Sequence, residues 1–203
     1  MSTPAPRPGS WIVSFNVNSI KSFVTKDGLL GLFERLKWPD IFCIQEYKLG
    51  AVGALTRPIG HVPGYTAWIT HSQLPKLKGY SGVMTYVRDS SPWTVASVEE
   101  GFSGLLQGSP VLPEMPLNLK ELESEGRCII TDHRAFVLFN VYFPAESTPD
   151  RASFKMAFSR AVAARMQHFA KVEKRRVVLV GDVNVCAAAI ELGFLSTGSK
   201  TCN

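Results

Sequence analysis

The sequence predicts a single domain of the α+β class, in which helices pack on a mixed β-sheet. Two patterns support this class. Residues 11–46 have the pattern of a strand, a helix and a second strand, whereas residues 127–143 have the pattern of a hairpin. Strands that alternate with helices and also form hairpins indicate both parallel and antiparallel pairs. A chain of 203 residues that is 45% hydrophobic can also bury a sizeable core.

The first part of the chain supplies the strand–helix–strand unit. Trp11 to Val17 places its large hydrophobic residues at every second position, which is a strand pattern. Asp27 is the expected N-cap of a helix, because leucine and phenylalanine then recur at helical spacing up to Leu36, and Pro39 closes it. Ile41 to Gln45 is nearly all hydrophobic, which indicates a strand covered on both faces.

The remaining elements are predicted in the same way. Strand patterns recur at Tyr65 to Thr70, Gly79 to Val87, Arg127 to Asp132, Ala135 to Phe143 and Arg176 to Val180. His133 and Arg134 are the expected turn of the hairpin. Residues 150–173 carry hydrophobic side chains three to four apart, which predicts an amphipathic helix. Residues 101–126 are rich in Gly, Pro and Ser and then acidic, so a surface excursion with a short helix near 118–123 is expected.

The two ends of the chain lack these patterns. Residues 1–10 are rich in proline and are expected to be a disordered lead without the apolar segment of a secretory signal. Residues 186–203 are set apart as a tail, within which Thr197 to Asn203 is expected to be an unstructured end, and residues 11–185 remain as the domain. No hydrophobic run approaches membrane-spanning length, so no membrane partner is expected.

Charge and cysteine content narrow the function class only slightly. The chain has 22 Lys and Arg against 17 Asp and Glu, a net charge of +5. That charge suits a polyanionic partner such as nucleic acid, although many unrelated proteins share it. The four cysteines have no CxxC spacing, and Cys43 and Cys128 lie in hydrophobic strand patterns. Buried thiols in a reducing compartment are therefore expected.

Four short motifs place polar side chains where predicted strands end. They are Phe15-Asn16-Val17-Asn18, Gln45-Glu46, Val141-Tyr142-Phe143-Pro144 and Gly181-Asp182-Val183-Asn184. Each puts an amide, a carboxylate or a phenol at the C-terminal end of a hydrophobic run. Side chains collected at strand ends converge on one edge of a sheet, which is how a metal-dependent phosphodiester hydrolase can build its site.

Glu46 is the expected ligand of a hard cation. A carboxylate directly after a hydrophobic strand is costly unless it reaches a metal, a cation or water. Mg²⁺ takes one or two carboxylates and keeps waters and phosphate oxygens, so it suits this site better than zinc does. The alternative is an exposed glutamate just beyond a strand.

Asp182 and Asn184 stand two residues apart, so in an extended backbone they point to the same side. Asp182 is then expected to hold and deprotonate a water, and Asn184 to donate a hydrogen bond to the nucleophile or to the developing charge. Asn16 and Asn18 repeat this geometry, and Tyr142 is expected to contact a phosphate oxygen. The alternatives are a Gly-Asp turn, an Asn-rich turn and an ordinary strand tyrosine.

Together the motifs resemble the exonuclease–endonuclease–phosphatase superfamily, and within it the apurinic/apyrimidinic (AP) endonucleases of the exonuclease III type. The resemblance spans roughly residues 11–185. It also rests on Pro39-Asp40-Ile41, Gly79-Tyr80-Ser81-Gly82-Val83 and Gly126-Arg127. The segment Gly79 to Val83 and the Tyr142 motif are typical of the DNA-repair branch. Residues 99–105 and 122–127 are most similar to the second eukaryotic AP endonucleases.

The resemblance implies a fold and a set of site residues. The fold would be part of a four-layer α/β sandwich, two mixed β-sheets flanked by helices, incomplete at the C-terminus. The implied cofactor is Mg²⁺, with Mn²⁺ as a substitute. The residues implied to hold it are Asn16, Glu46, Asp182 and Asn184, with Asn18 behind them. The residues implied to act on the scissile phosphate and the attacking water are Tyr142, Asp182 and Asn184.

The resemblance also implies an activity and partners. Water would attack the phosphodiester 5′ to an abasic site in double-stranded DNA during base excision repair, leaving a 3′-hydroxyl. The same centre would act as a 3′→5′ exonuclease or 3′-phosphodiesterase on 3′-blocked ends. Residence in the nucleus is implied, with the mitochondrion as the alternative. A sliding-clamp partner is implied only for a longer form.

Family members continue beyond the Gly181 to Asn184 motif and add a His-Asp pair. The chain is therefore expected to be C-terminally truncated and poorly active, with exposed strands near 135–143 and 176–185. Thr131-Asp132-His133 imitates the Ser-Asp-His motif of the family but falls at a hairpin turn, so it is not assigned that role. Three alternatives remain: another phosphoesterase of the superfamily, a non-catalytic DNA-binding fragment, and a domain whose strand-end polar residues are turns.

Overall fold

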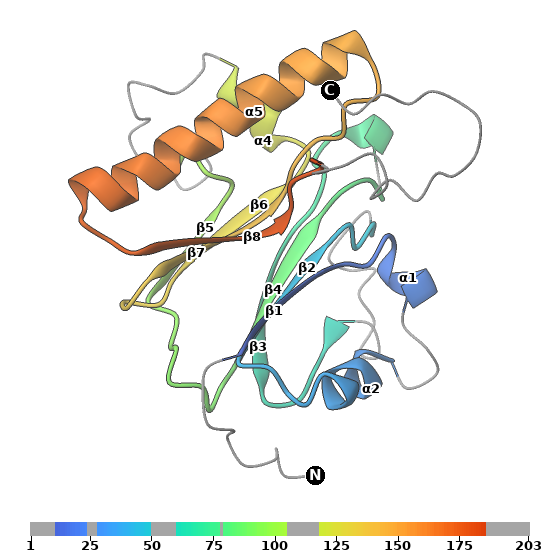
Figure 1. Ribbon diagram of the computed structural model, residues 1–203. Coiled ribbons are helices and arrows are strands. Elements are labelled where there is room, and N and C mark those ends of the chain that lie inside the picture. Colours follow the sequence, from blue (N-terminus) through green and yellow to red (C-terminus); the bar gives the residue numbers. More distant parts are fainter. Residues whose placement is uncertain (1–10, 24–27, 50–59, 78, 105–117, 186–203) are drawn as a thin grey trace.

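The computed structural model describes residues 11–23, 28–49, 60–77, 79–104 and 118–185. These residues form two four-stranded sheets that face each other, with helices on the outer face of each (Figure 1). This arrangement of helix, sheet, sheet and helix confirms the predicted four-layer sandwich. The expected lead 1–10, the N-cap Asp27 and the expected tail 186–203 lie outside the described residues.

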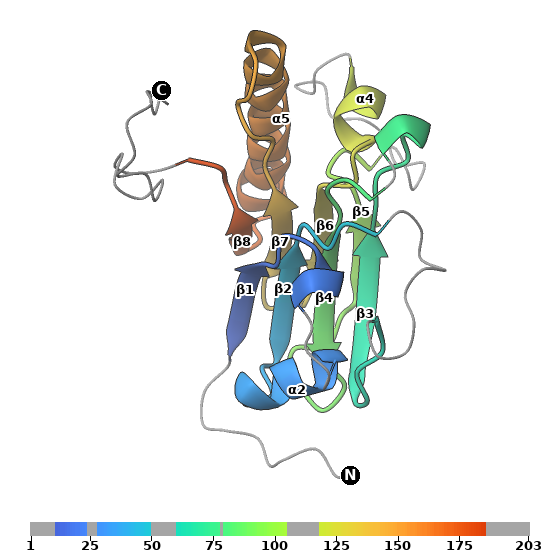
Figure 2. The same cartoon turned by 90° about the vertical axis from the view of Figure 1, so that its right-hand side faces the viewer.

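The first sheet has the order β1-β2-β4-β3. Its strands are β1 (Ile12–Asn16), β2 (Ile41–Gln45), β4 (Val83–Arg88) and β3 (Tyr65–Thr70). β1 and β2 run parallel with Asn16 opposite Gln45, and the other two pairs are antiparallel. The C-terminal ends of β1 and β2 therefore lie side by side, as Figure 2 shows.

The second sheet has the order β5-β6-β7-β8. Its strands are β5 (Ser97–Glu100), β6 (Cys128–Asp132), β7 (Val137–Tyr142) and β8 (Val177–Asp182). Here β7 and β8 are the parallel pair, with Tyr142 opposite Asp182, and the remaining pairs are antiparallel. Each sheet thus contributes one parallel pair to the same side of the sandwich.

Helices cover the outer faces of both sheets. The helical segments are α1 (Ile20–Phe23), α2 (Gly28–Arg35), the 3₁₀ turn η2 (Pro75–Leu77), α4 (Leu119–Glu123), α5 (Pro149–Gln167) and the π-helical turn η4 (His168–Val172). On the first sheet, Leu29 and Phe33 of α2 pack in one buried cluster with Phe42. On the second, Phe158 and Val162 of α5 pack in another such cluster. Among the described residues, no helix is long and apolar enough to cross a membrane.

The two sheets meet through hydrophobic side chains and one buried amide. Ile41, Cys43 and Leu138 form a buried cluster between them. Within this layer Asn140 accepts a hydrogen bond from Gln45 Nε2 (2.8 Å) and donates to the carbonyl of Met84 (2.8 Å). The sheets are therefore tied by directional bonds as well as by packing, because a fully buried amide must satisfy its polar atoms.

Cys43 and Cys128 are buried free thiols, as predicted. Burial raises the pKa of Cys43 to about 12 and also raises that of Cys128 well above its ordinary value. Both side chains act as small hydrophobic residues in the core. Cys186 and Cys202 lie outside the described residues.

Three sequence predictions need correction. The strand predicted from Gly79 begins only at Val83, because Ser81 and Gly82 have positive φ angles that end an extended strand. The predicted surface excursion is wrong for Glu123 and Glu125, which are buried, and its residues 105–117 lie outside the described residues. The predicted exposure of residues 135–143 is also wrong for β7, which is buried along its whole length, whereas β8 is half-buried.

Candidate active site

The predicted polar side chains gather where β1, β2, β7 and β8 end. We call Asn16, Glu46, Tyr142 and Asp182 the rim. The Nδ2 group of Asn16 donates to Glu46 Oε1 (2.9 Å) and to Asp182 Oδ2 (2.8 Å). One amide thus joins two carboxylates that come from different sheets. The predicted convergence of these strand ends is confirmed, but it joins the edges of two sheets and not one edge of a single sheet.

The Glu46 carboxylate is held ionised by its neighbours. Burial acts to raise its pKa, but hydrogen bonds from Asn16, Lys48 and Tyr142 outweigh burial and lower the pKa of Glu46 below its ordinary value. The Lys48 ammonium lies 2.5 Å from Glu46 Oε2 and donates to Asn18 Oδ1 at 2.5 Å. Glu46 is therefore not the merely exposed glutamate of the alternative interpretation.

The Tyr142 phenol stays protonated at the rim. Burial, followed by its hydrogen bond to Glu46, raises the pKa of Tyr142. Tyr142 is 7% exposed, and the Arg127 guanidinium carbon lies 4.5 Å from the centre of its ring. A protonated phenol at this position can donate a hydrogen bond to an oxyanion.

Two turns place the remaining predicted residues. The backbone N–H of Asn18 donates to Asn16 Oδ1 (2.9 Å), and that of Asn184 donates to Asp182 Oδ1 (2.9 Å). Asn18 and Asn184 have φ angles of 42° and 50°, so the extended backbone assumed for both motifs is wrong. Local turns and not strand alternation bring each pair together.

The Asn184 side chain is turned toward β7. Its Nδ2 group donates to the carbonyl of Phe143 (2.8 Å). The structure therefore brings Asn184 beside the rim, where it fixes the end of β7. Its predicted part in binding metal or assisting water stays a prediction.

Gly181 is required by the packing of β8 on β7. A Cβ atom built on it would lie 1.9 Å from the carbonyl oxygen of Val141, and its φ angle is 132°. The glycine lets the backbone pass close enough to present Asp182 beside Tyr142. The Gly-Asp sequence is thus a packing requirement of the strand pair.

Sequence reasoning gave no role to two cations at the site. Lys48 forms an ion pair with Glu46. Arg127 packs against the ring of Tyr142, and the Arg127 side chain is fully buried. The sequence places Arg127 in the Gly126-Arg127 motif, but nothing in it indicates that Arg127 touches Tyr142. The signal available for Lys48 is its place two residues after Glu46.

The rim offers donors that suit a hard cation. Glu46 and Asp182 supply carboxylate oxygens, which Mg²⁺ and Mn²⁺ accept, whereas the Asn16 Nδ2 group bonds both carboxylates and its Oδ1 accepts from the backbone N–H of Asn18. In the part of the chain that the structure describes, no group of three or more His, Cys, Asp or Glu side chains could hold a metal. A cation here would therefore keep several waters, as Mg²⁺ does.

Thr131-Asp132-His133 lies far from the rim, as its predicted place at a hairpin turn requires. His133 lies at the turn between β6 and β7, at the opposite end of β7 from Tyr142. It is buried, stacks on Phe136, and has a ring nitrogen 2.9 Å from Thr131 Oγ1. Burial lowers the pKa of His133, which keeps it neutral in the core.

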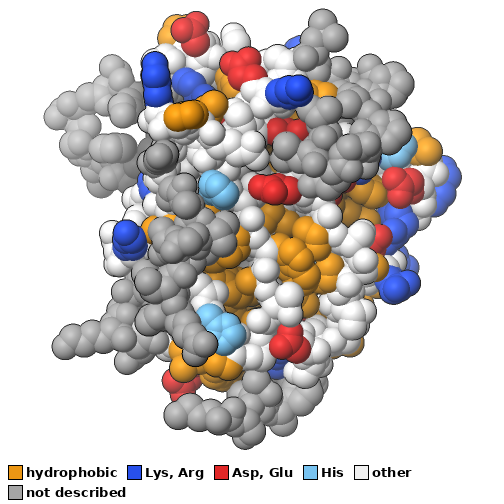
Figure 3. Space-filling model, turned by 180° about the vertical axis from the view of Figure 1, so that it is seen from behind, with side chains coloured by type: hydrophobic (Ala, Val, Ile, Leu, Met, Phe, Trp, Pro, Cys, Tyr) orange, Lys and Arg blue, Asp and Glu red, His pale blue; other side chains and the backbone are white. Residues whose placement is uncertain are grey.

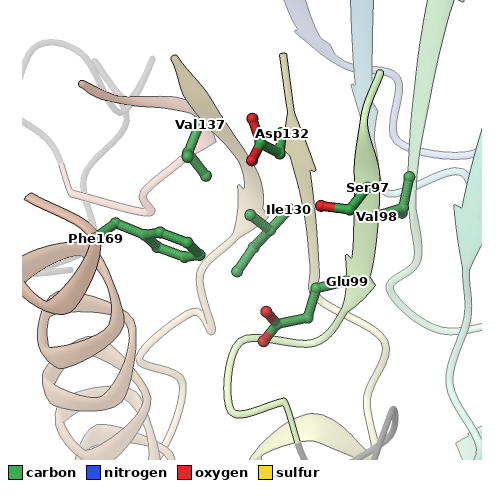
Figure 4. A pocket seen from close by; sticks show the side chains of 7 residues that line it. All are labelled: Ser97, Val98, Glu99, Ile130, Asp132, Val137 and Phe169. Carbon is green, nitrogen blue, oxygen red and sulfur yellow. The ribbon is translucent and has the colours of Figure 1, made fainter. Parts of the chain in front are cut away.

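A cavity of about 210 Å³ lies away from the rim, under the C-terminal end of α5 (Figure 4). Its lining includes Glu99, Asp132, Val137 and Phe169. Val137 is the first residue of β7, so this cavity is at the far end of the sheet from Tyr142. Arg165 pairs with Glu99 (2.6 Å) and Arg175 with Asp132 (2.6 Å), so both carboxylates are neutralised within the fold.

On the side away from β1 and β8, the sheets end at β3 and β5. Hydrophobic side chains are visible on this face, with histidine and acidic side chains beside them (Figure 3). Trp68 of β3 and Val98 of β5 are partly buried here against Val83 and Ile129. Tyr142 of the rim belongs to the same buried cluster.

Sequence comparison finds relatives over most of the chain. AP endonuclease 2 of Schizosaccharomyces pombe is 30% identical over a segment that covers 89% of this chain and 38% of that relative. AP endonuclease 2 of Bos taurus is 33% identical, covering 75% of this chain and 32% of the relative. The chain thus spans about a third to two fifths of the length of these relatives. No family model matches it.

Structure comparison shows the same fold. An AP endonuclease from Archaeoglobus fulgidus matches with a TM-score of 0.65 and 23% identity, over 90% of this chain and 60% of that one. A 3′ phosphatase from Neisseria, solved with a product DNA hairpin, matches with a TM-score of 0.56 and 21% identity, over 89% and 60%. The chain is therefore a homologue of AP endonuclease 2, and it has the fold of the exonuclease III-type AP endonucleases.

Proposed function

We propose that the rim is the centre of a divalent-cation-dependent nuclease that incises DNA 5′ to abasic sites during base excision repair. The observation that carries the proposal is the Asn16 amide, which holds Glu46 and Asp182 together across the two sheets. The names of the relatives support an abasic-site substrate. Because the chain spans only part of those relatives, their activity is transferred here as a proposal.

The cation would be held by Glu46 and Asp182, and Asn16 would keep these two carboxylates in place around it. Mg²⁺ is the proposed ion and Mn²⁺ its substitute, since both accept carboxylate, amide and water oxygens. When bound, such a cation offsets negative charge on the phosphate. The lowered pKa of Glu46 supports this assignment, because the carboxylate is then ionised at neutral pH.

The chain's own residues supply the other steps. Asp182 would orient a water and accept its proton, and the protonated phenol of Tyr142 would donate to a phosphate oxygen. Lys48, beside Glu46, would attract the phosphate backbone of the substrate. Asn184 would assist at the attacking water, from the turn that also fixes the end of β7.

A second activity at the same rim is 3′ processing. The Neisseria relative in fold is named a 3′ phosphatase and was solved with a product DNA hairpin, which favours 3′-blocked ends as alternative substrates. We further propose residence in the nucleus. A sliding-clamp contact is proposed only for a longer form of the protein.

The test is incision of a duplex that carries one abasic site, with Mg²⁺ and with a chelator. We expect Mg²⁺-dependent product, reduced about 10²–10⁴-fold in Asp182→Asn. Asp89→Asn is the matched control, because Asp89 is exposed just beyond the opposite end of β4 and should leave the rate unchanged.

Two outcomes would contradict the proposal. DNA binding that falls steeply with salt, without any Mg²⁺-dependent product, would favour the non-catalytic DNA-binding alternative. Hydrolysis of a phosphoinositide or a sphingomyelin in preference to DNA would favour another phosphoesterase of the superfamily.

A further inference from the structure

Helix α5 begins beside the rim and carries two cations on one face. Arg151 and Lys155 are four residues apart, a spacing that places both side chains on the same side of a helix. The first turn is fixed by Thr148, whose Oγ1 accepts a hydrogen bond from the backbone N–H of Arg151 (3.3 Å). From there α5 runs across the outer face of the second sheet (Figure 1).

Arg151 makes a two-pronged contact with Glu125. Its Nη1 donates to Glu125 Oε1 (2.7 Å), and its Nη2 donates to Oε2 (3.0 Å). Paired bonds of this kind fix direction as well as distance. The Glu125 side chain is only 5% exposed, so water competes little for it.

The Glu125 carboxylate, which Arg151 holds, also accepts a hydrogen bond from Arg127. Arg127 Nε donates to Glu125 Oε2 (2.6 Å), and the Arg127 side chain is fully buried. Its other two nitrogens donate to the carbonyl of Tyr142 (3.1 Å) and to the Tyr80 hydroxyl (2.8 Å). A buried guanidinium with every nitrogen bonded has one position, and its plane lies against the Tyr142 ring.

Lys155 reaches the second strand of the rim. Its Nζ donates to the carbonyl of Asn184 (2.8 Å), in the turn that follows Asp182. The two cations of α5 therefore hold the ends of β7 and β8, one through a chain of ion pairs and one directly.

We propose that the first two turns of α5 are a brace for the rim, with Arg151 positioning Tyr142 through Glu125 and Arg127, and Lys155 positioning the turn that carries Asn184. Arg151 and Lys155 are positioning residues, because within the described part of the chain the polar contacts of their side chains are with Glu125 and with the Asn184 carbonyl and not with Glu46 or Asp182. The effect on catalysis rests on the proposed function above, whereas the positioning itself does not.

If α5 acts as this brace, substitutions of Arg151 and Lys155 should change the NMR signals of different rim residues, and these signals can be measured without DNA. In protein labelled with ¹³C at the ring carbon that bears the tyrosine hydroxyl, the chain gives five tyrosine signals, and Tyr142→Phe identifies the one from Tyr142. We expect Arg151→Met to shift and broaden that signal, and Arg151→Lys to do so less. Lys155→Met should instead move the side-chain amide signal of Asn184 and leave Tyr142 in place.

Arg160→Met is the matched control, because Arg160 is an exposed arginine on the same helix. It should leave both signals unchanged while removing the same charge. If Arg151→Met and Arg160→Met give the same Tyr142 signal as the unsubstituted protein, the positioning of Tyr142 is wrong. If Lys155→Met leaves the Asn184 signal unchanged, the second half of the brace is wrong.

Kinetics then test the consequence for catalysis. In Arg151→Met we expect kcat for abasic-site incision to fall at least about tenfold with little change in KM, since a misplaced group weakens the reaction more than binding. Arg151→Lys should recover part of the loss. If the unsubstituted chain does not incise, the proposed function fails while the resonance data still decide the brace. Unchanged kcat in Arg151→Met, with a shifted Tyr142 signal, would overturn the catalytic part.

Discussion

Glu46 shows how single residues of the rim depend on side chains that the sequence does not connect. Its strand and its position were predictable, because a carboxylate directly after a hydrophobic run must reach a partner. The residues that contact Glu46 were less predictable from the sequence. Lys48 contacts Glu46 at 2.5 Å and Asn16 contacts it at 2.9 Å, and only Asn16 belongs to a strand-end motif of the sequence.

Removing the Lys48 charge should raise the pKa of Glu46. Lys48 lowers that pKa by a hydrogen bond and by its charge, so Lys48→Met leaves burial less opposed. A carboxyl-carbon NMR titration of Glu46 should then show a higher midpoint. Lys120→Met, which removes an exposed lysine on α4, should leave the midpoint where it was. An unchanged midpoint in Lys48→Met would mean that the ion pair does not form in solution.

Gly181→Ala should destabilise the protein by about 1–3 kcal/mol, because the new Cβ would overlap the Val141 carbonyl. Gly79→Ala is the comparison. Its Cβ would meet nothing closer than 3.4 Å, so only the strain of a φ angle of 75° remains, about 1–2 kcal/mol. Urea unfolding measures both, and we expect the lower midpoint for Gly181→Ala. The reverse order would show that β8 can move away from β7.

At the scale of elements, the sequence predicted helices and strands correctly where their hydrophobic periodicity extended over many residues. The length of α5 allowed its periodicity to be read, although its last turn is π-helical from His168 to Val172. β5 was missed because Ser97–Glu100 is short and ends in two glutamates. The buried glutamates near α4 were also missed, since Glu123 is satisfied by the backbone N–H groups of Phe102 and Ser103, far along the chain.

At the same scale, the hydrogen bonds of Asn140 between the two sheets should contribute most to the stability of the fold. Asn140→Leu would remove the acceptor of one of the two Gln45 Nε2 hydrogen bonds, the other being to Ser14, and it would remove the donor to the Met84 carbonyl. We expect a loss of about 3 kcal/mol in the free energy of unfolding, since each buried unsatisfied group costs about 1–3 kcal/mol. Thermal unfolding would measure it. Asn118→Leu is the control, because Asn118 is exposed and its side chain caps nothing. Equal stability of the two variants would show that water can replace Asn140.

At the scale of the whole molecule, the packing of the two sheets positions the rim residues. Each sheet brings one parallel pair to the same side, so the polar ends of four strands meet where no single segment of sequence could place them. Strand positions and the convergence of their ends were predictable from residue patterns. The chain of contacts from Arg151 to Tyr142 was not predictable, because it joins α5 and β7 through Glu125 and Arg127, which lie between α4 and β6 and share no sequence pattern with them.

Stability of the whole molecule should fall in acid. Burial opposes ionisation of Glu125, but its bonds to Arg151 and Arg127 lower its pKa below the ordinary 4.5, and Arg175 lowers the pKa of Asp132. Carboxyl groups with lowered pKa values stabilise the fold above their ordinary pKa, and the stabilisation is lost as pH falls through the folded-state values. The urea midpoint should therefore drop below about pH 4.5. Glu125→Gln should flatten part of that dependence, and an identical pH profile would contradict the assignment.

The most direct test of the account is whether the rim binds a divalent cation. Mn²⁺ binding, measured from the electron paramagnetic resonance signal of the free ion, can be compared in the unsubstituted chain, Glu46→Gln, Asp182→Asn and the exposed-site control Glu34→Gln. We predict a single site whose Kd rises at least about tenfold in the first two variants and is unchanged in the control. Equal Mn²⁺ binding by all four proteins would mean that the strand-end side chains are turns, and the central claim would be wrong.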